Sequence, residues 1–204
     1  TLEDIEEVRK KLGLDGSLPG QYARWLGNFF QGDFGTSWNN RRPVLDRMLP
    51  RIAVSAQLGV MSILIAIMVS IPGGGIAAVK QDTWIDYVLR SISMAFESMP
   101  NFWFALIMIV SLLMVFDWIP PISYSTPWEN PYDNLRILIF PALVIGARGS
   151  AGMLRMTRSS VLEVLREDYV RTAQSKGLHN REVLFVHVLR NALLPVTTLA
   201  GFEV

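Results

Sequence analysis

The sequence predicts an all-α protein, a bundle of membrane-spanning helices joined by segments that face water. Half of its 204 residues are hydrophobic and its mean hydropathy is +0.30, which is high for a soluble domain but modest for a chain made only of spans. Residues 52–79 form a run of 28 without a charge. Roughly 20 helical residues cross the ~30 Å hydrocarbon core. The chain is therefore expected to divide into a water-exposed part, 1–51, and a transmembrane part, 52–204.

The first part, residues 1–51, is polar to amphipathic. Residues 3–12 place acids in a first helical turn and lysines in a last one, which predicts a solvated helix. Residues 22–30 then carry aromatic side chains at amphipathic spacing, which suits either an interface or core packing. Turn-forming residues at 32–37 and two prolines lead to the first span.

Two spans are predicted before the middle of the chain. The first covers about residues 52–75, because Pro72 and the three glycines after it should end or break the helix. A polar link, residues 80–90, follows. The second span covers about residues 91–116, with Glu97 inside its first part.

A third span is predicted over about residues 135–154, although only 137–147 are free of charge. Arg148 must therefore snorkel to the interface or face the bundle interior. Glycine, alanine and serine around it would let helices pack closely. A fourth span begins at about 191–204, and because the chain starts without Met and stops within this apolar run, we expect it to be a fragment.

The distribution of basic residues predicts the orientation. Residues 148–190 hold eight Lys and Arg, residues 80–90 hold two, and residues 117–135 hold none. Since cytoplasmic loops are enriched in Lys and Arg, the loop at about 155–190 should lie in the cytoplasm and residues 117–134 outside. Alternation then places residues 1–51 outside, despite eight bases that seven acids accompany.

The polar stretch 168–196 lies between apolar blocks and resembles an element held by another protein. Apolar residues recur at helical spacing over 159–176, which predicts one amphipathic helix. Gly177 can adopt positive φ at its end, and Asn180 is suited to cap a second helix. Ala173 and Gly177 are small and four residues apart, so they should leave a shallow spot for a neighbour.

At these residues the sequence resembles the membrane-spanning permease subunits of ABC transporters. Their EAA loop reads Glu-Ala-Ala, three residues, Gly, nine residues, Ile-x-Leu-Pro, and this chain keeps Ala173, Gly177 and Leu189 of it. Its departures match the peptide/nickel branch, which reads R-T-A-x-x-K-G-L followed by H-x-L-R-N-A-L-x-P. Residues 32–37, G-D-F-G-T-S, and the Pro-Val at 43–44 resemble the same branch.

The resemblance implies a helical bundle of the ABC importer permease type whose loop is a coupling helix held by an ATPase. The loop residues that it assigns to coupling are Tyr169, Arg171, Thr172, Ala173, Lys176, Gly177, Leu178, His179, His187, Leu189 and Arg190. It implies four kinds of partner: a second homologous permease subunit, two cytoplasmic ATPase subunits, an extracytoplasmic solute-binding protein and membrane lipid. It implies a bacterial or archaeal cytoplasmic membrane and a dipeptide or oligopeptide cargo, with nickel chelates left open.

Several functions have no support in the sequence. With 19 basic against 18 acidic residues there is no overall field to attract nucleic acid. No G-x-x-x-x-G-K-[ST] motif is present, so ATP hydrolysis is expected on separate subunits. The chain has no Cys, and its two His residues form no ligand pattern, so neither a metal nor a cofactor is expected. The remaining alternatives are a membrane enzyme, which would rest on Glu97, Asp117 and Glu203, and a membrane scaffold whose basic loop binds lipid headgroups or a different partner.

Four residues are candidates for a translocation route. Glu97 is a functional candidate because an acid within a span is costly without a partner. Its position a few residues from Arg90 slightly favours a structural ion pair or a short reach to the cytoplasmic interface. Ser55 and Gln57 could face the route or form hydrogen bonds between helices. Met99, among aromatic neighbours, could accept varied peptide side chains or pack against lipid.

Overall fold

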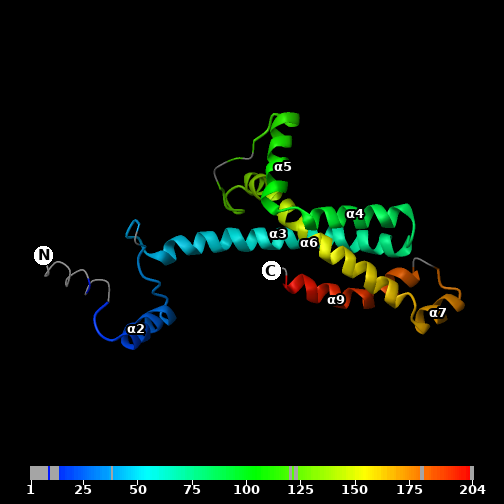
Figure 1. The fold of residues 1–204 in the computed structure, drawn as a ribbon, viewed down its shortest axis with the longest axis horizontal. Coiled ribbons are helices and arrows are strands. Elements are labelled where there is room, and N and C mark those ends of the chain that lie inside the picture. Colours follow the sequence, from blue (N-terminus) through cyan, green and yellow to red (C-terminus); the bar gives the residue numbers. More distant parts are fainter. Residues whose placement is uncertain are drawn as a thin grey trace. The chain divides into compact units, whose positions relative to one another are not determined.

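The computed structural model describes residues 9, 14–37, 39–119, 121, 124–179 and 182–202. Over these residues the chain is helical and contains no β-strand, which confirms the all-α prediction (Figure 1). Apart from Arg9, the predicted helix at 3–12 lies outside the described residues, as does Asn180. The chain forms two compact units, Thr1–Ser55 and Ala56–Val204, that meet within one helix.

The first unit is built on α2 (Leu18–Phe30), which has proline in its first turn and buries no side chain. Aromatic rings follow one another along it, with ring centroids 5.9 Å apart for Tyr22 and Trp25 and 5.6 Å apart for Trp25 and Phe29. Phe34, beyond the helix, packs against Phe29 at 5.1 Å. The predicted amphipathic aromatic stretch is therefore a helix with an exposed aromatic face.

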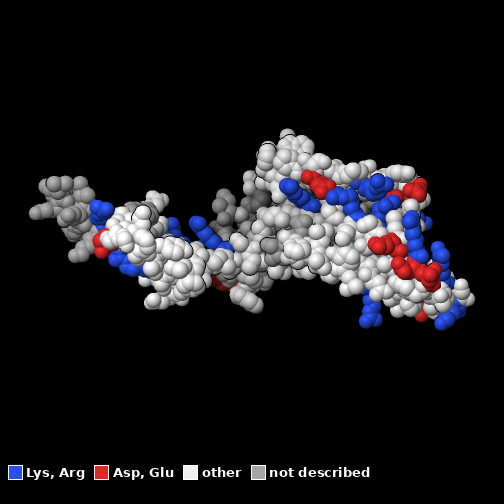
Figure 2. Space-filling view, turned by 60° about the horizontal axis from the view of Figure 1, so that its bottom comes forward, with Lys and Arg blue, Asp and Glu red and all other residues white. Residues whose placement is uncertain are grey.

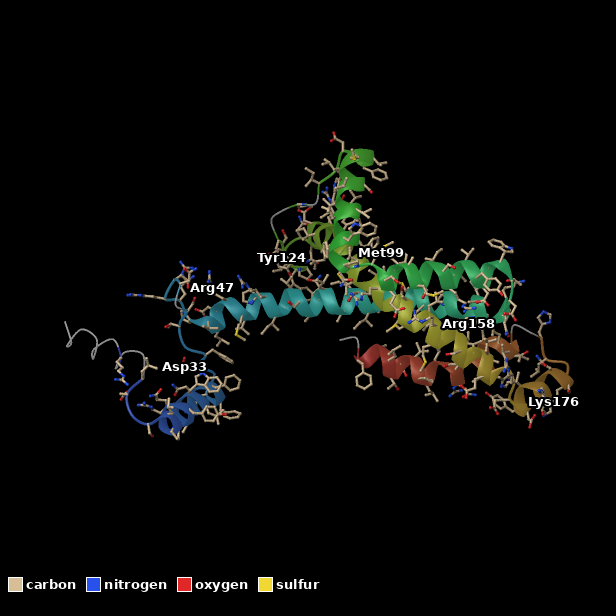
Figure 3. The ribbon with its side chains drawn as sticks, in the orientation of Figure 1. Asp33, Arg47, Met99, Tyr124, Arg158 and Lys176 are labelled. Atoms are coloured by element: carbon tan, nitrogen blue, oxygen red, sulfur yellow. The ribbon has the colours of Figure 1, made fainter. Side chains whose placement is uncertain are left out.

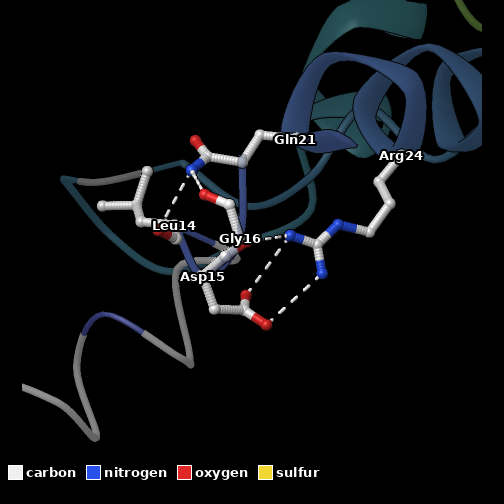
Figure 4. Close-up of polar contacts among 5 residues, drawn as sticks. All are labelled: Leu14, Asp15, Gly16, Gln21 and Arg24. Atoms are coloured by element: carbon white, nitrogen blue, oxygen red, sulfur yellow. Dashed lines mark hydrogen bonds and ion pairs between the residues drawn. The ribbon is translucent and has the colours of Figure 1, made fainter. Parts of the chain in front are cut away.

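Polar contacts fold the residues before α2 back onto it (Figure 4). Arg24 pairs with the carboxylate of Asp15 at 3.4 Å and donates a hydrogen bond to the Asp15 carbonyl. The Gln21 amide donates to the carbonyls of Leu14, at 3.0 Å, and Gly16, at 3.2 Å. These side-chain bonds give the short segment before α2 a fixed local path.

Helix α3 (Val44–Val79) continues through residues 72–75, so the predicted break there is wrong. The glycines serve helix packing. A Cβ added at Gly74 would lie 2.6 Å from the Leu154 carbonyl oxygen in α6 (Pro131–Val164), and one at Gly146 of α6 would lie 2.7 Å from the Ser62 carbonyl oxygen. The two backbones approach closely because these positions lack side chains.

The predicted second span is not one helix. Helix α4 (Trp84–Ser98) and helix α5 (Asn101–Phe116) meet at a bend of 105°. Pro100 lacks an amide hydrogen and disfavours helical ψ in the residue before it, and Met99 has ψ 131°. The polar link predicted at 80–90 is also shorter than expected, because α4 already begins at Trp84.

Helix α6 passes through Arg148 as predicted for the third span, and it extends further at both ends. The Asn130 side chain accepts a hydrogen bond from the Asp133 amide at its start, 3.2 Å away. In the turn before it, the Thr126 amide and hydroxyl donate to the Glu129 carboxylate, which lowers the pKa of Glu129. Helix α6 packs against α4, α5 and the last helix, α9 (Leu189–Phe202), and so forms the centre of the second unit.

After α6 the chain forms α7 (Asp168–Ser175) and a π-helical segment, η1 (Val183–Val188), which continues into α9. The single helix predicted at 159–176 is wrong, since the chain turns at 165–167. The second helix predicted after Asn180 is present as η1, but it continues into the predicted fourth span, which therefore begins at Val183 instead of about 191. One buried cluster joins the elements: Ala78, Val161, Val170, Ala173, Val183, Val188 and Ala192.

Three described helices are long and apolar enough to cross a membrane, namely α3, α6 and Val183–Phe202, and the bent pair α4–α5 adds a fourth if it counts as one span. With the bent pair counted as one span, the number agrees with the four spans predicted from the sequence.

Candidate functional site

Helix α7 presents a polar face to water and an apolar face to the molecule. Val170 is fully buried and Ala173 is 6% exposed, both in the buried cluster. On the other face the side chains of Asp168 and Arg171 are 99% and 70% exposed. Lys176 projects from the same end of the second unit (Figure 3). Helix α7 is thus anchored on one side and open on the other.

Gly177 ends this segment with φ +80°, the left-handed conformation expected from the sequence. Its amide donates to the Gln174 carbonyl at 2.9 Å. A Cβ at Gly177 would meet nothing within 4 Å, so the position is open. The shallow spot predicted from Ala173 and Gly177 together is wrong, because Ala173 faces the buried cluster and only Gly177 faces outward.

Tyr169 joins α7 to the junction of η1 and α9. Its hydroxyl donates to the His187 carbonyl at 3.4 Å, and the Asn191 amide donates to the Tyr169 oxygen at 2.9 Å. Leu178 and Leu189 pack against the buried cluster. The structure therefore gathers both halves of the predicted loop at one end of the second unit. The outward-facing members are Tyr169, Arg171, Thr172, Lys176, Gly177, His179 and Arg190, while His187 is half-buried.

A buried ion pair that sequence reasoning missed joins α4 to α6. Arg158 donates from Nε to Asp86 Oδ1 and from Nη2 to Asp86 Oδ2, each at 2.7 Å. The Asp86 side chain is fully buried and that of Arg158 is 17% exposed. Asp86 Oδ2 also accepts the amide of Asp82, whose φ is +60°. The sequence signal for it is weak, because Asp86 is one of two acids in the predicted link 80–90.

A second pair joins the end of α4 to α6. Arg155 makes a two-pronged contact with Glu97, in which Nη2 lies 2.8 Å from Oε1 and Nη1 bonds Oε2. Both side chains are half-exposed, 47% for Glu97 and 40% for Arg155. Glu97 therefore forms a structural ion pair, and its partner is Arg155 on α6.

Gln57 bonds across helices. Its side chain exchanges hydrogen bonds with the amide of Asn134, which is 3% exposed, and accepts one from the Tyr124 hydroxyl at 3.3 Å. Asn134 donates further to the Ser125 carbonyl at 2.8 Å. Ser55 is exposed.

Met99 is half-buried at the bend between α4 and α5 (Figure 3). It lines a cavity of about 410 Å³ together with Ala95, Ser98, Pro100, Phe102 and Trp103. The aromatic surroundings expected for it are therefore present.

Within the described part of the chain, no three or more His, Cys, Asp or Glu side chains come together in a way that could hold a metal ion.

Comparison with known proteins places these elements in a family. A family model described as "Binding-protein-dependent transport system inner membrane component" matches residues 70–204, which include both ion pairs and α7. The chain is 41% identical to the oligopeptide transport system permease protein AppB of Bacillus subtilis (strain 168), over 98% of this chain and 65% of that protein.

Two further relatives are similar over almost the whole chain. The chain is 38% identical to the di/tripeptide transport system permease protein DppB of Pseudomonas aeruginosa (strain UCBPP-PA14). It is 37% identical to the dipeptide transport system permease protein DppB of Escherichia coli (strain K12). Each alignment covers 97% of this chain and 65% of the relative. The chain thus spans about two thirds of the length of these curated relatives.

Proposed function

We propose a function from one premise: the chain belongs to the family of binding-protein-dependent transport system inner membrane components. It is a multi-pass membrane protein, and it forms part of the permease of an ATP-driven peptide importer in a bacterial or archaeal cytoplasmic membrane. The peptide cargo is supported by the names of the relatives, which are oligopeptide, di/tripeptide and dipeptide permeases.

The polar face of α7 and the Gly177 turn receive a cytoplasmic ATPase subunit. This assignment is supported by the anchoring of α7, whose Val170 and Ala173 pack into the same buried cluster as Val161 of α6. A push on α7 therefore displaces α6 as well, because close-packed side chains transmit strain instead of absorbing it. The proposal rests on one observation: α7 is exposed on its polar face and packs against α6 with its apolar face.

The movement reaches the bent pair α4–α5 through the Asp86–Arg158 contact. Arg158 lies one helical turn before Val161 on α6, and Asp86 lies in the first turn of α4. Displacement of α6 therefore pulls the start of α4, and the bend at Pro100 lets α5 change its angle. Rigid helices hinged at such a break are a common way to open and close a pathway.

The remaining partners follow from the family. A second homologous permease subunit completes the pathway, a second ATPase binds that subunit, and an extracytoplasmic solute-binding protein delivers the peptide. ATP hydrolysis belongs to the ATPases.

The coupling assignment is tested by making Gly177 bulky. Gly177→Trp adds a large side chain to the open surface at positive φ, and Gly177→Asn is the matched control, since Asn tolerates left-handed backbone. We expect the Trp variant to lose both copurification of the ATPase and peptide uptake, while the Asn variant keeps most of both. If the Trp variant still copurifies with the ATPase and still imports peptide, the coupling surface is elsewhere.

A further inference from the structure

Arg148 lies inside the membrane-crossing part of α6 wherever the helix is centred in the bilayer. Helix α6 covers residues 131–164, and about 20 residues cross the hydrocarbon core. Every stretch of that length within α6 contains Arg148 and at least one more charged residue. Arg148 is nevertheless exposed on the surface of this chain. Its guanidinium therefore either reaches the interface along the helix or faces polar surroundings in the assembly.

Two further charged side chains share this surface. Arg155 follows Arg148 by two helical turns, so both lie on the same face of α6. Glu97 comes from α4 and is held by Arg155, and both of these side chains are half-exposed. In Figure 2 basic and acidic side chains gather over the part of the second unit that holds α4 and α6. Charged groups of this kind do not face lipid. Because residues from about 155 onward are predicted to lie in the cytoplasm, water is expected to reach along this face from Arg155 to Arg148.

The charges on this surface do not balance. Arg155 is compensated by the two contacts with Glu97, whereas Arg148 forms no ion pair with any acidic residue that the structure describes. Glu97 attracts both arginines, and the three side chains together carry one net positive charge. A guanidinium is suited to a carboxylate, which it can bind through two parallel hydrogen bonds.

An apolar cavity of about 400 Å³ lies between α5 and α6 and ends one helical turn before Arg148 on α6. Ile145, one turn before Arg148, lines it together with Phe102, Met108 and Phe140. A cavity of this size with almost wholly apolar walls accepts a hydrophobic side chain. A carboxylate site beside an apolar cavity matches the chemistry of the last residue of a peptide.

We propose that Arg148 binds the terminal carboxylate of a peptide in transit, while the side chain of the last residue enters the cavity between α5 and α6. The Glu97–Arg155 pair positions this site, because it cancels the second arginine and leaves a single cation. This inference rests on the proposed function as a peptide permease.

The access of water to this face is measured by thiol labelling. The chain has no Cys, so an introduced one reports its own position. Gly152, one turn after Arg148, accepts a Cys because a Cβ there meets nothing within 4 Å. Val60, an exposed apolar residue of α3, gives the control Val60→Cys. We expect a membrane-impermeant thiol reagent to label G152C in the assembled transporter at least ten times faster than V60C, on the order expected when water replaces hydrocarbon. Equal rates would overturn the aqueous route.

Substrate recognition is tested with a tripeptide and its C-terminal amide in proteoliposomes that contain the complete transporter. Concentrations are chosen so that the binding protein is saturated with either peptide. Arg148→Gln should lower uptake of the free acid about ten- to a hundredfold, as for a lost charge-assisted hydrogen bond, and leave the amide unchanged. Arg148→Lys should retain part of the preference for the free acid over the amide. The control Arg136→Gln, also on α6 but stacked on Trp118 and Tyr132, should leave the ratio unaltered.

Three outcomes separate the possibilities. An unchanged ratio of acid to amide in R148Q overturns the inference. So does loss of the second permease subunit from the purified R148Q complex, because Arg148 would then bind that subunit. If the wild-type transporter imports no peptide at all, it is the proposed function that fails.

Discussion

At the scale of single residues, the pair Asp86–Arg158 shows how much depends on a contact between positions 72 apart. Removing two charges from water is costly, and mutual attraction offsets that cost only with good geometry and additional hydrogen bonds. Both conditions are met here, because the contact is two-pronged and Asp86 also accepts the Asp82 amide.

Asp86→Asn should therefore destabilise the protein strongly. It leaves Arg158 as an uncompensated buried charge, which costs about 3–5 kcal/mol in buried pairs. The half-exposed pair supplies the control, since Glu97→Gln should cost no more than about 1 kcal/mol, as for exposed pairs. Thermal unfolding of the purified transporter in detergent measures both. Equal losses of stability in the two variants would show that the burial of Asp86 does not determine how much its ion pair contributes.

At the scale of elements, the packing of α3 on α6 explains why a Pro-Gly-Gly-Gly sequence remains helical. In isolation these residues disfavour a helix, by about 1 kcal/mol for each glycine. In the molecule their small size allows the backbone of α6 to approach, and the dispersion and burial gained there outweigh the local preference. The bend at Pro100 is the opposite case, in which the local preference prevails.

Gly74→Ala should weaken the contact between α3 and α6. The new methyl group would lie 2.6 Å from both the Leu154 carbonyl oxygen and Thr157 Cβ, so a backbone must move, which costs typically about 1–3 kcal/mol. Gly59→Ala, on the same helix, is the matched control, because nothing lies within 4 Å of its new Cβ. A comparison of unfolding temperatures tests this. Equal temperatures for the two variants would contradict the close approach.

At the scale of the whole molecule, α7 separates two properties that a transporter must combine, namely attachment of the ATPase and transmission of its movement. In the proposed function, the exposed face, with Arg171, serves attachment, and the buried face, with Val170, serves transmission. Substitutions on the two faces should therefore have different consequences.

Val170→Ala removes part of a fully buried side chain, and full burial of a valine is worth about 1.5–3 kcal/mol. We expect the ATPase still to copurify with this variant, while the amount of peptide imported per ATP hydrolysed falls, because α7 is less firmly fixed to α6. Arg171→Ala should instead reduce copurification. Peptide uptake and ATP hydrolysis are measured together in reconstituted vesicles. Their ratio is the amount of peptide imported per ATP hydrolysed. A normal ratio in V170A would refute transmission through the buried cluster.

The sequence by itself determined the fold class and the family, because these depend on local quantities. Charge-free length predicts a span whatever surrounds it, and the motif around Gly177 is read directly from consecutive residues. The left-handed conformation of Gly177 was predictable for the same reason, since it is a property of one residue at a helix end.

Only the tertiary structure decided where the helices end, which side of α7 is buried and which charges pair. Helix α3 crosses its glycines because α6 lies against them, and Ala173 faces inward because Val161 is there to receive it. Asp86 and Glu97 found partners on α6, more than fifty residues away in each case. No local pattern contains this information, because the energy of such a contact depends on burial and distance, which exist only once the helices are packed.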